Sequence, residues 1–196
     1  MAKIKWRGGA LTAPVPPVMV SCGNMEDSNI ITVAWTGIIN TVPPKTYISV
    51  RPSRHSYSLI KESGEFVVNL TTAEMIKKAD FCGIYTGAKV DKFAKCGLDK
   101  EEATEVSCPV IAQSPLALEC KVTDVIELGS HHMFLADIVA VDVDETLVDQ
   151  KGKLHLDRAH LAAFAHGEYF ELGRKIGYFG FSVDKKRKKS NTHTRK

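Results

Sequence analysis

The segment from Arg51 to Ser56 holds two arginines and two serines within six residues. Guanidinium and hydroxyl groups suit a phosphate monoester, because hydrogen bonds from charged donors are the stronger kind. Ser53 can cap a helix running from about Arg54 to Ser63, so the unpaired N–H groups of its first turn would face the same place. The positive end of a helix also favours an anion. The pattern predicts a site for a phosphorylated cofactor; the alternative is a pair of solvated surface charges.

Two strands must position this segment. The run 30–35 is dominated by β-branched and aromatic residues, and a second such run, 47–50, leads directly into the arginines. The Pro43-Pro44 pair separates the two runs, since proline cannot donate to a strand ladder. We therefore expect a β-rich hairpin that ends at the cationic segment.

Strand patterns continue later in the chain. Residues 116–123 alternate between apolar and polar side chains, with Glu119 on the polar side, which predicts a strand with one solvent-facing side. A break near residue 129 predicts a long antiparallel hairpin over about 115–143. A further short strand is expected at 66–70.

Helical patterns are fewer, at 57–63, 72–81 and 157–170, with Thr72 and Asp157 as N-caps. Many strands joined by hairpins, with three modest helices among them, predict a mainly β protein built as an antiparallel barrel. No G-x-G-x-x-G motif follows a strand and the chain has no Walker lysine motif, so neither a Rossmann domain nor a P-loop is expected.

Length and composition predict one domain, because 196 residues with 44% hydrophobic content can bury a single sizeable core. Residues 184–196 hold seven of the 26 basic residues and one of the 23 acidic ones, which leaves 19 basic and 22 acidic residues, a net charge of −3, in 1–183. We expect 1–183 to fold and the basic tail 184–196 to be disordered. Polyanion binding by the tail is the alternative, but nucleic-acid binding is not expected, since no aromatic residue there could stack on bases.

The chain is expected to be cytoplasmic and to cross no membrane. No apolar run approaches the roughly 18 residues of a membrane span, and the N-terminus lacks the apolar block of a signal peptide. The five cysteines form no Cys-x-x-Cys pair, so we expect reduced thiols, mostly in the core. His155, His160 and His166 lack the spacing of a helical zinc pair, and no metal site is predicted.

Several blocks of the sequence together carry a family resemblance. They are NIITVAWTGIIN, PPKTYISVRPSRHSYSLI, SGEFVVNL, GSHHMFLADI and YFELGRKIGYFGFSV. Through them, the chain from Val18 to Val183 resembles the flavin reductase-like domain family, and within it the flavoredoxins. The resemblance implies a homodimeric split β-barrel that binds FMN near the subunit interface.

The resemblance also assigns residues to the flavin. His131 matches the histidine of the family's Gly-Asp-His loop, although Ser130 stands where many reductases have Asp, which weakens the case for direct nicotinamide recognition. Ser56 replaces a common Thr and keeps the hydroxyl. His132 would point away from His131 in an extended hairpin. The residues expected along the isoalloxazine are Asn29, Thr32, Ala34, Trp35 and Thr36; those expected at the phosphate are Arg51, Ser53, Arg54 and Ser56; Lys92 adds a cation, and Phe164 closes the pocket.

The function implied is an FMN-dependent oxidoreductase that passes electrons through bound FMN. The donor would be NAD(P)H or a redox protein, and no side chain is expected to act as a nucleophile or general base, because the cofactor carries the chemistry. An NAD(P)H-dependent flavin or ferric reductase that uses FMN as a substrate is the enzymatic alternative. A phosphate- or polyanion-binding barrel is the non-enzymatic one.

Overall fold

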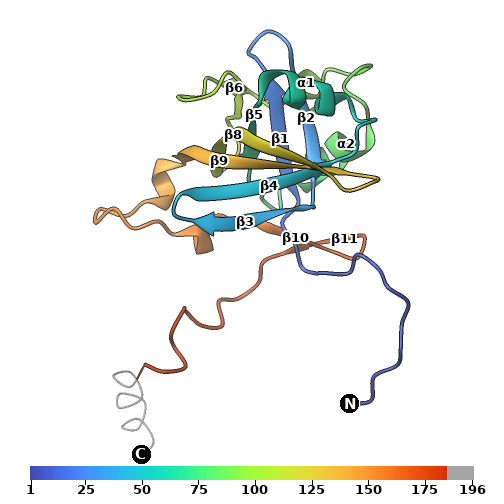
Figure 1. The fold of residues 1–196 in the computed structure, drawn as a ribbon. Helices are drawn as coiled ribbons and strands as arrows, with labels where there is room; N and C mark the ends of the chain where they lie inside the picture. Colours follow the sequence, from blue (N-terminus) through green and yellow to red (C-terminus); the bar gives the residue numbers. More distant parts are fainter. Residues whose placement is uncertain (185–196) are drawn as a thin grey trace, which may run out of the picture.

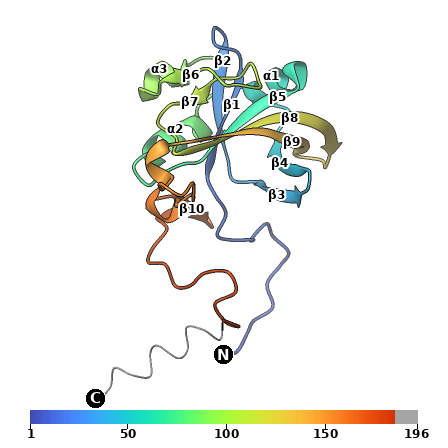
Figure 2. The same cartoon turned by 90° about the vertical axis from the view of Figure 1, so that its left-hand side faces the viewer.

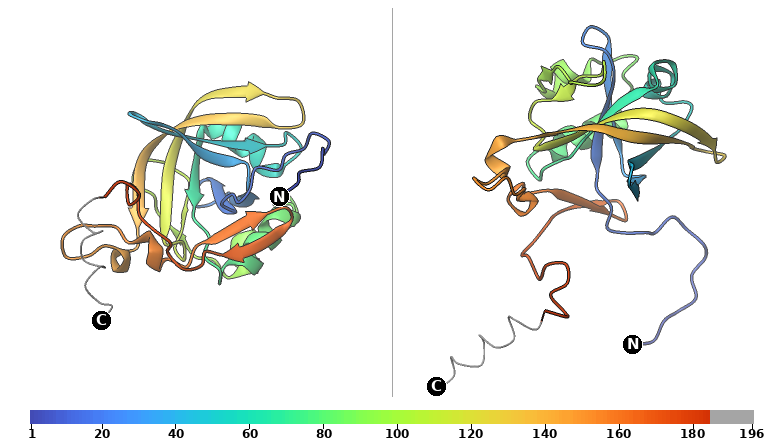
Figure 3. Two further views of the ribbon diagram at one scale, coloured as in Figure 1. Left: turned by 90° about the horizontal axis from the view of Figure 1, so that it is seen from below. Right: turned by 60° about the vertical axis from the view of Figure 1, so that its left-hand side comes forward.

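The computed structural model describes residues 1–184, so the predicted basic tail lies almost wholly outside the described residues. Its main feature is a seven-stranded antiparallel sheet with the order β2-β1-β5-β8-β9-β4-β3, which curls into a split barrel (Figures 1 and 3). The mainly β, antiparallel fold is therefore as predicted. The strands are β1 Val18–Gly23, β2 Ser28–Val33, β3 Thr36–Thr41, β4 Pro44–Val50, β5 Glu65–Asn69, β8 Leu116–Glu127 and β9 His132–Val143.

Smaller elements cover the openings of the barrel. In Figure 2, α2 and α3 lie to one side of β1 and β2, α1 lies on the other side near the top, and β10 lies below. No helix of the described part is long and apolar enough to cross a membrane. The helices are α1 His55–Ser63, α2 Ile76–Ile84, α3 Lys92–Cys96, η1 Glu145–Leu147 and η2 Leu156–Arg158; the short strands are β6 Lys100–Glu101, β7 Val110–Ile111, β10 Ala162–Ala165 and β11 Glu168–Glu171.

Alternation along the strands separates two cores. Val18 and Val20 of β1 face the inside of the barrel, where they join Phe66, Phe134 and, from α1, Ile60. Met19, between them on β1, is also fully buried, but on the opposite side of the sheet, where α2 and α3 pack. Because β1 is covered on both sides, the strands that flank it pair with a densely packed central strand.

The predicted helix over 157–170 is wrong. Apart from the short η2 turn, this segment forms the β10–β11 hairpin, in which Ala162 pairs with Glu171 and Ala165 with Glu168. The two residues between the strands, His166 and Gly167, both have positive φ, as a tight hairpin turn requires. The alanines favoured a helix locally, but tertiary strand pairing prevailed.

The two predicted N-caps upstream are also wrong. Arg54, not Ser53, is the N-cap residue of α1, and no side chain caps that helix. Thr72 does not begin α2, which starts at Ile76, because Thr72 pairs its backbone with Leu161 beside β10. Tertiary contacts, and not capping side chains, therefore fix where both helices start.

Glu119 corrects the prediction of one solvent-facing side on β8. Its side chain is fully buried, and its two oxygens accept hydrogen bonds from the backbone N–H groups of Thr104, Glu105 and Val106 and from the Thr104 hydroxyl, at 2.6–3.1 Å. Burial alone would raise the pKa of Glu119, but these hydrogen bonds hold it below its usual value. The loop before β7 covers the side of β8 that the alternation predicted to face solvent.

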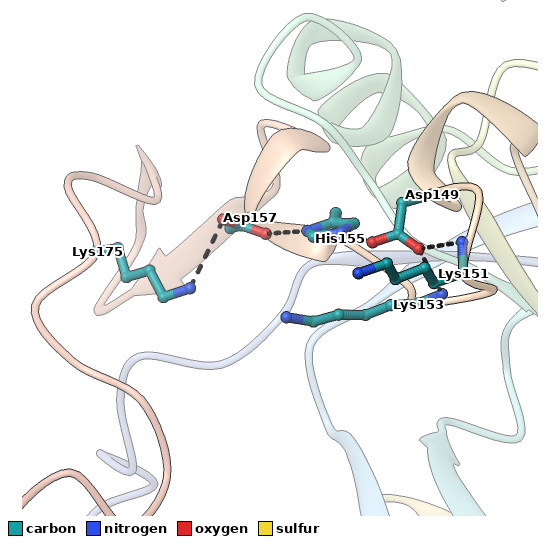
Figure 4. A network of polar contacts seen from close by, with 6 residues as sticks. All are labelled: Asp149, Lys151, Lys153, His155, Asp157 and Lys175. Carbon is teal, nitrogen blue, oxygen red and sulfur yellow. Dashed lines mark hydrogen bonds and ion pairs between the residues drawn. The ribbon is translucent and has the colours of Figure 1, made fainter. Parts of the chain in front are cut away.

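A second charged group holds the loop after β9 (Figure 4). Asp149 accepts hydrogen bonds from His155 Nε2 at 2.9 Å and from the backbone N–H groups of Lys151 and Lys153 at 2.9 and 3.0 Å. On its other side, His155 lies 3.8 Å from Asp157, which also pairs with Lys175 at 3.8 Å. We call the six residues drawn in Figure 4 the Asp149 network; it ties the C-terminal segment to this loop.

Candidate functional site

A cavity of about 280 Å³, cavity 1, opens where the ends of β2 and β4 meet the β8–β9 turn. Two pairings create it. Val50 lies opposite His132, so the next residues outward, Arg51 and His131, reach the same edge of the sheet. The Ser49 N–H donates to the Trp35 carbonyl at 2.9 Å, which holds the β2–β3 corner beside the end of β4. The lining combines apolar and aromatic residues from the sheet with side chains of α2 and the β10–β11 hairpin: Pro17, Ile31, Thr32, Val33, Ala34, Trp35, Ser49, Val50, Arg51, Arg54, Asp80, Gly83, Ile84, His131, Phe164 and Tyr169.

A smaller cavity of about 180 Å³, cavity 2, adjoins the first and shares Ile31, Arg51 and Arg54 with it. It lies at the N-terminal end of α1. Polar donors dominate its walls, in contrast with cavity 1, and its lining includes no carboxylate. The remaining lining residues are Asn29, Ser53, His55, Ser56, Cys82, Tyr85, Thr86, Gly87 and Lys92.

The cations of cavity 2 have no counter-charge. Within residues 1–184, Arg51, Arg54 and Lys92 take part in no ion pair. Burial lowers the pKa of Lys92, and Arg54 lowers it further although the neighbouring cysteines oppose the shift. His131 likewise has a lowered pKa, from burial and then from the two arginines. A cluster of like charges without a partner is unfavourable alone and favours a bound anion.

Lys92 is held in an unusual position for a lysine, only 3% exposed. Its ammonium group donates to the carbonyls of Ile30 and Cys82, at 2.6 and 2.8 Å, and so connects β2 with α2. Cys82 itself is buried next to Cys96, with the two sulfurs 3.9 Å apart, and burial followed by the neighbouring thiol raises its pKa to about 12. The thiol is therefore protonated at neutral pH and unreactive.

The inner wall of cavity 2 is tightly built. Asn29 donates from Nδ2 to the Ser56 hydroxyl at 2.7 Å, and both residues are buried. The backbone at Gly87 passes so close that a Cβ atom there would lie 2.1 Å from Asn29 Oδ1. Only glycine fits at that position.

The structure brings eleven of the twelve predicted residues to these cavities. Thr36 is the exception: its hydroxyl donates to the Tyr47 carbonyl at 2.7 Å, within the β3–β4 pair, and its side chain is buried there. Cavity 1 has Thr32, Ala34, Trp35, His131 and Phe164; cavity 2 has Asn29, Ser53, Ser56 and Lys92; Arg51 and Arg54 line both.

The two adjacent histidines separate as the strand alternation predicts. His131 lines cavity 1, and its Nδ1 lies 2.9 Å from the Ser130 hydroxyl. The Nδ1 atom of His132 instead lies 2.8 Å from the Tyr57 hydroxyl, against α1. Only His131 is placed to contact a ligand in cavity 1.

The sequence reasoning missed a hydrogen-bonded pair in cavity 1. Tyr169 of β11 donates its hydroxyl to Asp80 of α2 at 3.0 Å, and burial together with Asp80 raises the pKa of Tyr169 to about 12. This bond links the hairpin to the helix across the cavity. No local motif signals it, because the hairpin itself was predicted as a helix.

Comparisons with known proteins agree with this geometry. A family model described as "Flavin reductase like domain" matches residues 10–172. A protein of Archaeoglobus fulgidus is 32% identical over 140 residues, which cover 71% of this chain and 79% of the relative. The flavoredoxin of Desulfovibrio vulgaris (Miyazaki F) matches with a TM-score of 0.86 at 28% identity, over 93% of this chain and all of the other. The flavoredoxin of Methanosarcina acetivorans matches with a TM-score of 0.84 at 26% identity, over 94% of this chain and all of the other. The chain therefore belongs to the flavin reductase-like domain family, whose members are flavin-binding proteins of the oxidoreductase type.

Proposed function

We propose that residues 1–183 form one FMN-binding domain that passes electrons through its bound flavin, in the manner of a flavoredoxin. The observation that carries the proposal is the pairing of cavities 1 and 2. Cavity 1 has aromatic and apolar walls, and cavity 2 is lined by three cations and no carboxylate. A flavin mononucleotide has the matching polarity, because it joins a flat ring to a terminal dianion.

At the phosphate end, Arg51, Arg54 and Lys92 would supply positive charge. Ser53 and Ser56 would supply hydroxyl donors there. The arginines are exposed and can reorient toward a ligand, whereas Lys92 is fixed by two carbonyls. The cavity ends against the buried Lys92 and the tight Gly87 backbone, which suits a terminal group. This favours FMN over FAD.

At the ring end, Trp35 and Phe164 would form walls, and Thr32, Ala34 and His131 would lie around the flavin. Asn29, expected along the ring from the family resemblance, lines cavity 2 and would lie at the phosphate end instead. Thr36 would act indirectly, by holding the β2–β3 corner. Bound flavin would supply the redox chemistry, taking electrons from NAD(P)H or a redox protein and giving them to an acceptor. The chain's residues would bind, orient and partly shield it, and Arg51 and Arg54, which line both cavities, would favour a reduced, anionic ring.

We further propose a homodimer. Large apolar side chains of the N- and C-terminal segments are exposed, with Trp6 at 71%, Ile176 at 89% and Phe179 fully exposed. Both segments extend from the body below β3 and β10 (Figures 1 and 2). A second copy could cover them. The five cysteines are all free, which fits the reducing cytoplasm.

Flavin binding and reduction test the proposal together. The purified protein should show flavin absorbance and release FMN on denaturation, and it should bind FMN more tightly than FAD or riboflavin. An anaerobic titration with NADH, NADPH and a reduced ferredoxin-type donor, followed by flavin bleaching, would identify the donor. Saturation of the rate by free FMN would instead indicate a flavin reductase that uses FMN as a substrate. Failure to bind added flavin would refute the proposal.

A further inference from the structure

A third cavity, of about 200 Å³, lies next to the proposed flavin site, and we call it cavity 3. Its walls come from residues 10–13, the β10–β11 turn, and the side chains of Trp35 and Phe164, which also line cavity 1. Val15 fixes the N-terminal segment here, because it exchanges two backbone hydrogen bonds with Phe164, at 2.8 and 2.9 Å. Cavities 1 and 3 therefore meet at two aromatic side chains.

The lining of cavity 3 is chemically different from that of cavity 2. Leu11, Val15, Trp35 and Phe164 provide apolar surface, and no Asp, Glu, Lys or Arg is among its lining residues. His166 is its one titratable group. A site of this size and polarity suits a small, uncharged, planar molecule, since a charged one would lose hydration without gaining a partner.

We propose that cavity 3 is the acceptor subsite, and that it holds the hydrocarbon ring of an uncharged aromatic carbonyl compound such as a naphthoquinone. The proposal rests on the proposed function. A quinone there would take a hydride, that is two electrons and one proton, from the reduced anionic flavin and a second proton from solvent, so that both carbonyls become hydroxyls and the flavin returns to its oxidised form. Trp35 and Phe164 contact both cavities, and so they set how closely the quinone approaches the ring.

Leu11 offers a test outside the flavin-binding residues. It is 53% exposed, so a polar replacement should fold. Calorimetric titration of menadione into the oxidised, flavin-loaded protein should show that Leu11→Asp weakens menadione binding about tenfold or more, since a carboxylate would enter an apolar wall. Ile4→Asp is the matched control, because Ile4 lies on the same segment, is 80% exposed and lines none of the cavities described here; it should bind menadione as the parent does.

Steady-state rates give an independent measure. The KM for menadione should rise about tenfold in Leu11→Asp, whereas the KM for ferricyanide, a hydrated anion that needs no apolar wall, should not change. Equal menadione affinity in the parent and Leu11→Asp would overturn the proposal, as would an equal loss in Ile4→Asp. Flavin uptake is titrated separately: absence of uptake refutes the proposed function, whereas normal uptake without menadione binding refutes only the acceptor subsite.

Discussion

The cations of cavity 2 and the Asp149 network are both charged, but they are built in opposite ways. In the network, Asp149 accepts hydrogen bonds from His155 and from backbone N–H groups, and Asp157 lies between His155 and Lys175 (Figure 4). In cavity 2, Arg51, Arg54 and Lys92 gather without a single carboxylate. The first arrangement is complete within the chain and serves stability. The second is complete only with an anionic ligand, which is why it indicates a binding site.

The largest expected effect concerns the cations of cavity 2, which lack a counter-charge until an anionic ligand binds. Arg54→Ala should weaken FMN binding by about 1–3 kcal/mol, because a charged hydrogen bond to the phosphate is lost. Riboflavin, which lacks the phosphate, should bind almost unchanged. Fluorescence titration with both flavins measures this, with Arg158→Ala as the arginine control beside the Asp149 network. Equal losses for FMN and riboflavin would show that Arg54 does not bind the phosphate.

The next effect concerns the Asp149 network, whose contacts all lie within the chain. Asp149→Asn should lower the thermal midpoint at neutral pH without changing flavin affinity. Hydrogen bonds from His155 and then from the Lys153 and Lys151 N–H groups lower the pKa of Asp149 from 3.8 to about 2. A lowered folded-state pKa contributes stability above the unfolded value, so this contribution is lost as the pH falls from about 4 through 2. Thermal scans over this range should show parent and variant converging; a constant difference would contradict the assignment.

A smaller effect concerns His131. Burial is the main cause of the lowered pKa of His131, and the charges of Arg51 and Arg54 lower it further. Arg54→Ala should therefore raise the pKa of His131 in the flavin-free protein. NMR titration of the imidazole protons measures the shift. An unchanged His131 pKa would mean that solvent screens the arginines.

The smallest effect belongs to the edge of the Asp149 network. Lys175→Ala should change the free energy of unfolding by no more than about 0.5 kcal/mol, because exposed ion pairs contribute little. The Lys175 and Asp157 side chains are 62% and 48% exposed, and their charged atoms are 3.8 Å apart. Denaturant unfolding of the parent and of Lys175→Ala measures this change in the free energy of unfolding. A loss as large as that of Asp149→Asn would show that the C-terminal segment is more firmly docked than its exposure indicates.

The errors in predicting this fold have a common cause. The alanine-rich run at 162–165 favours a helix locally, and Glu119 alternates as a solvent-facing residue would. Both patterns were overruled by strand or loop partners: β10 pairs with β11 on one side and, through Phe164, with Val15 on the other, and the loop at 104–106 encloses the Glu119 carboxylate. Local propensity holds no information about such partners.

The sequence by itself determined strands β2, β4 and β5, the long β8–β9 hairpin and the cationic segment after β4, because alternation, proline breaks and charge spacing are local properties. Only the tertiary structure decided that Lys92 would be buried behind the arginines, that Thr36 would turn into the sheet, and that Asp80 and Tyr169 would meet across cavity 1. These outcomes depend on how α2 packs against β2, on the β3–β4 pairing and on the contact between β11 and α2. Packing of that kind is set by the free energy of the whole core, which no short segment encodes.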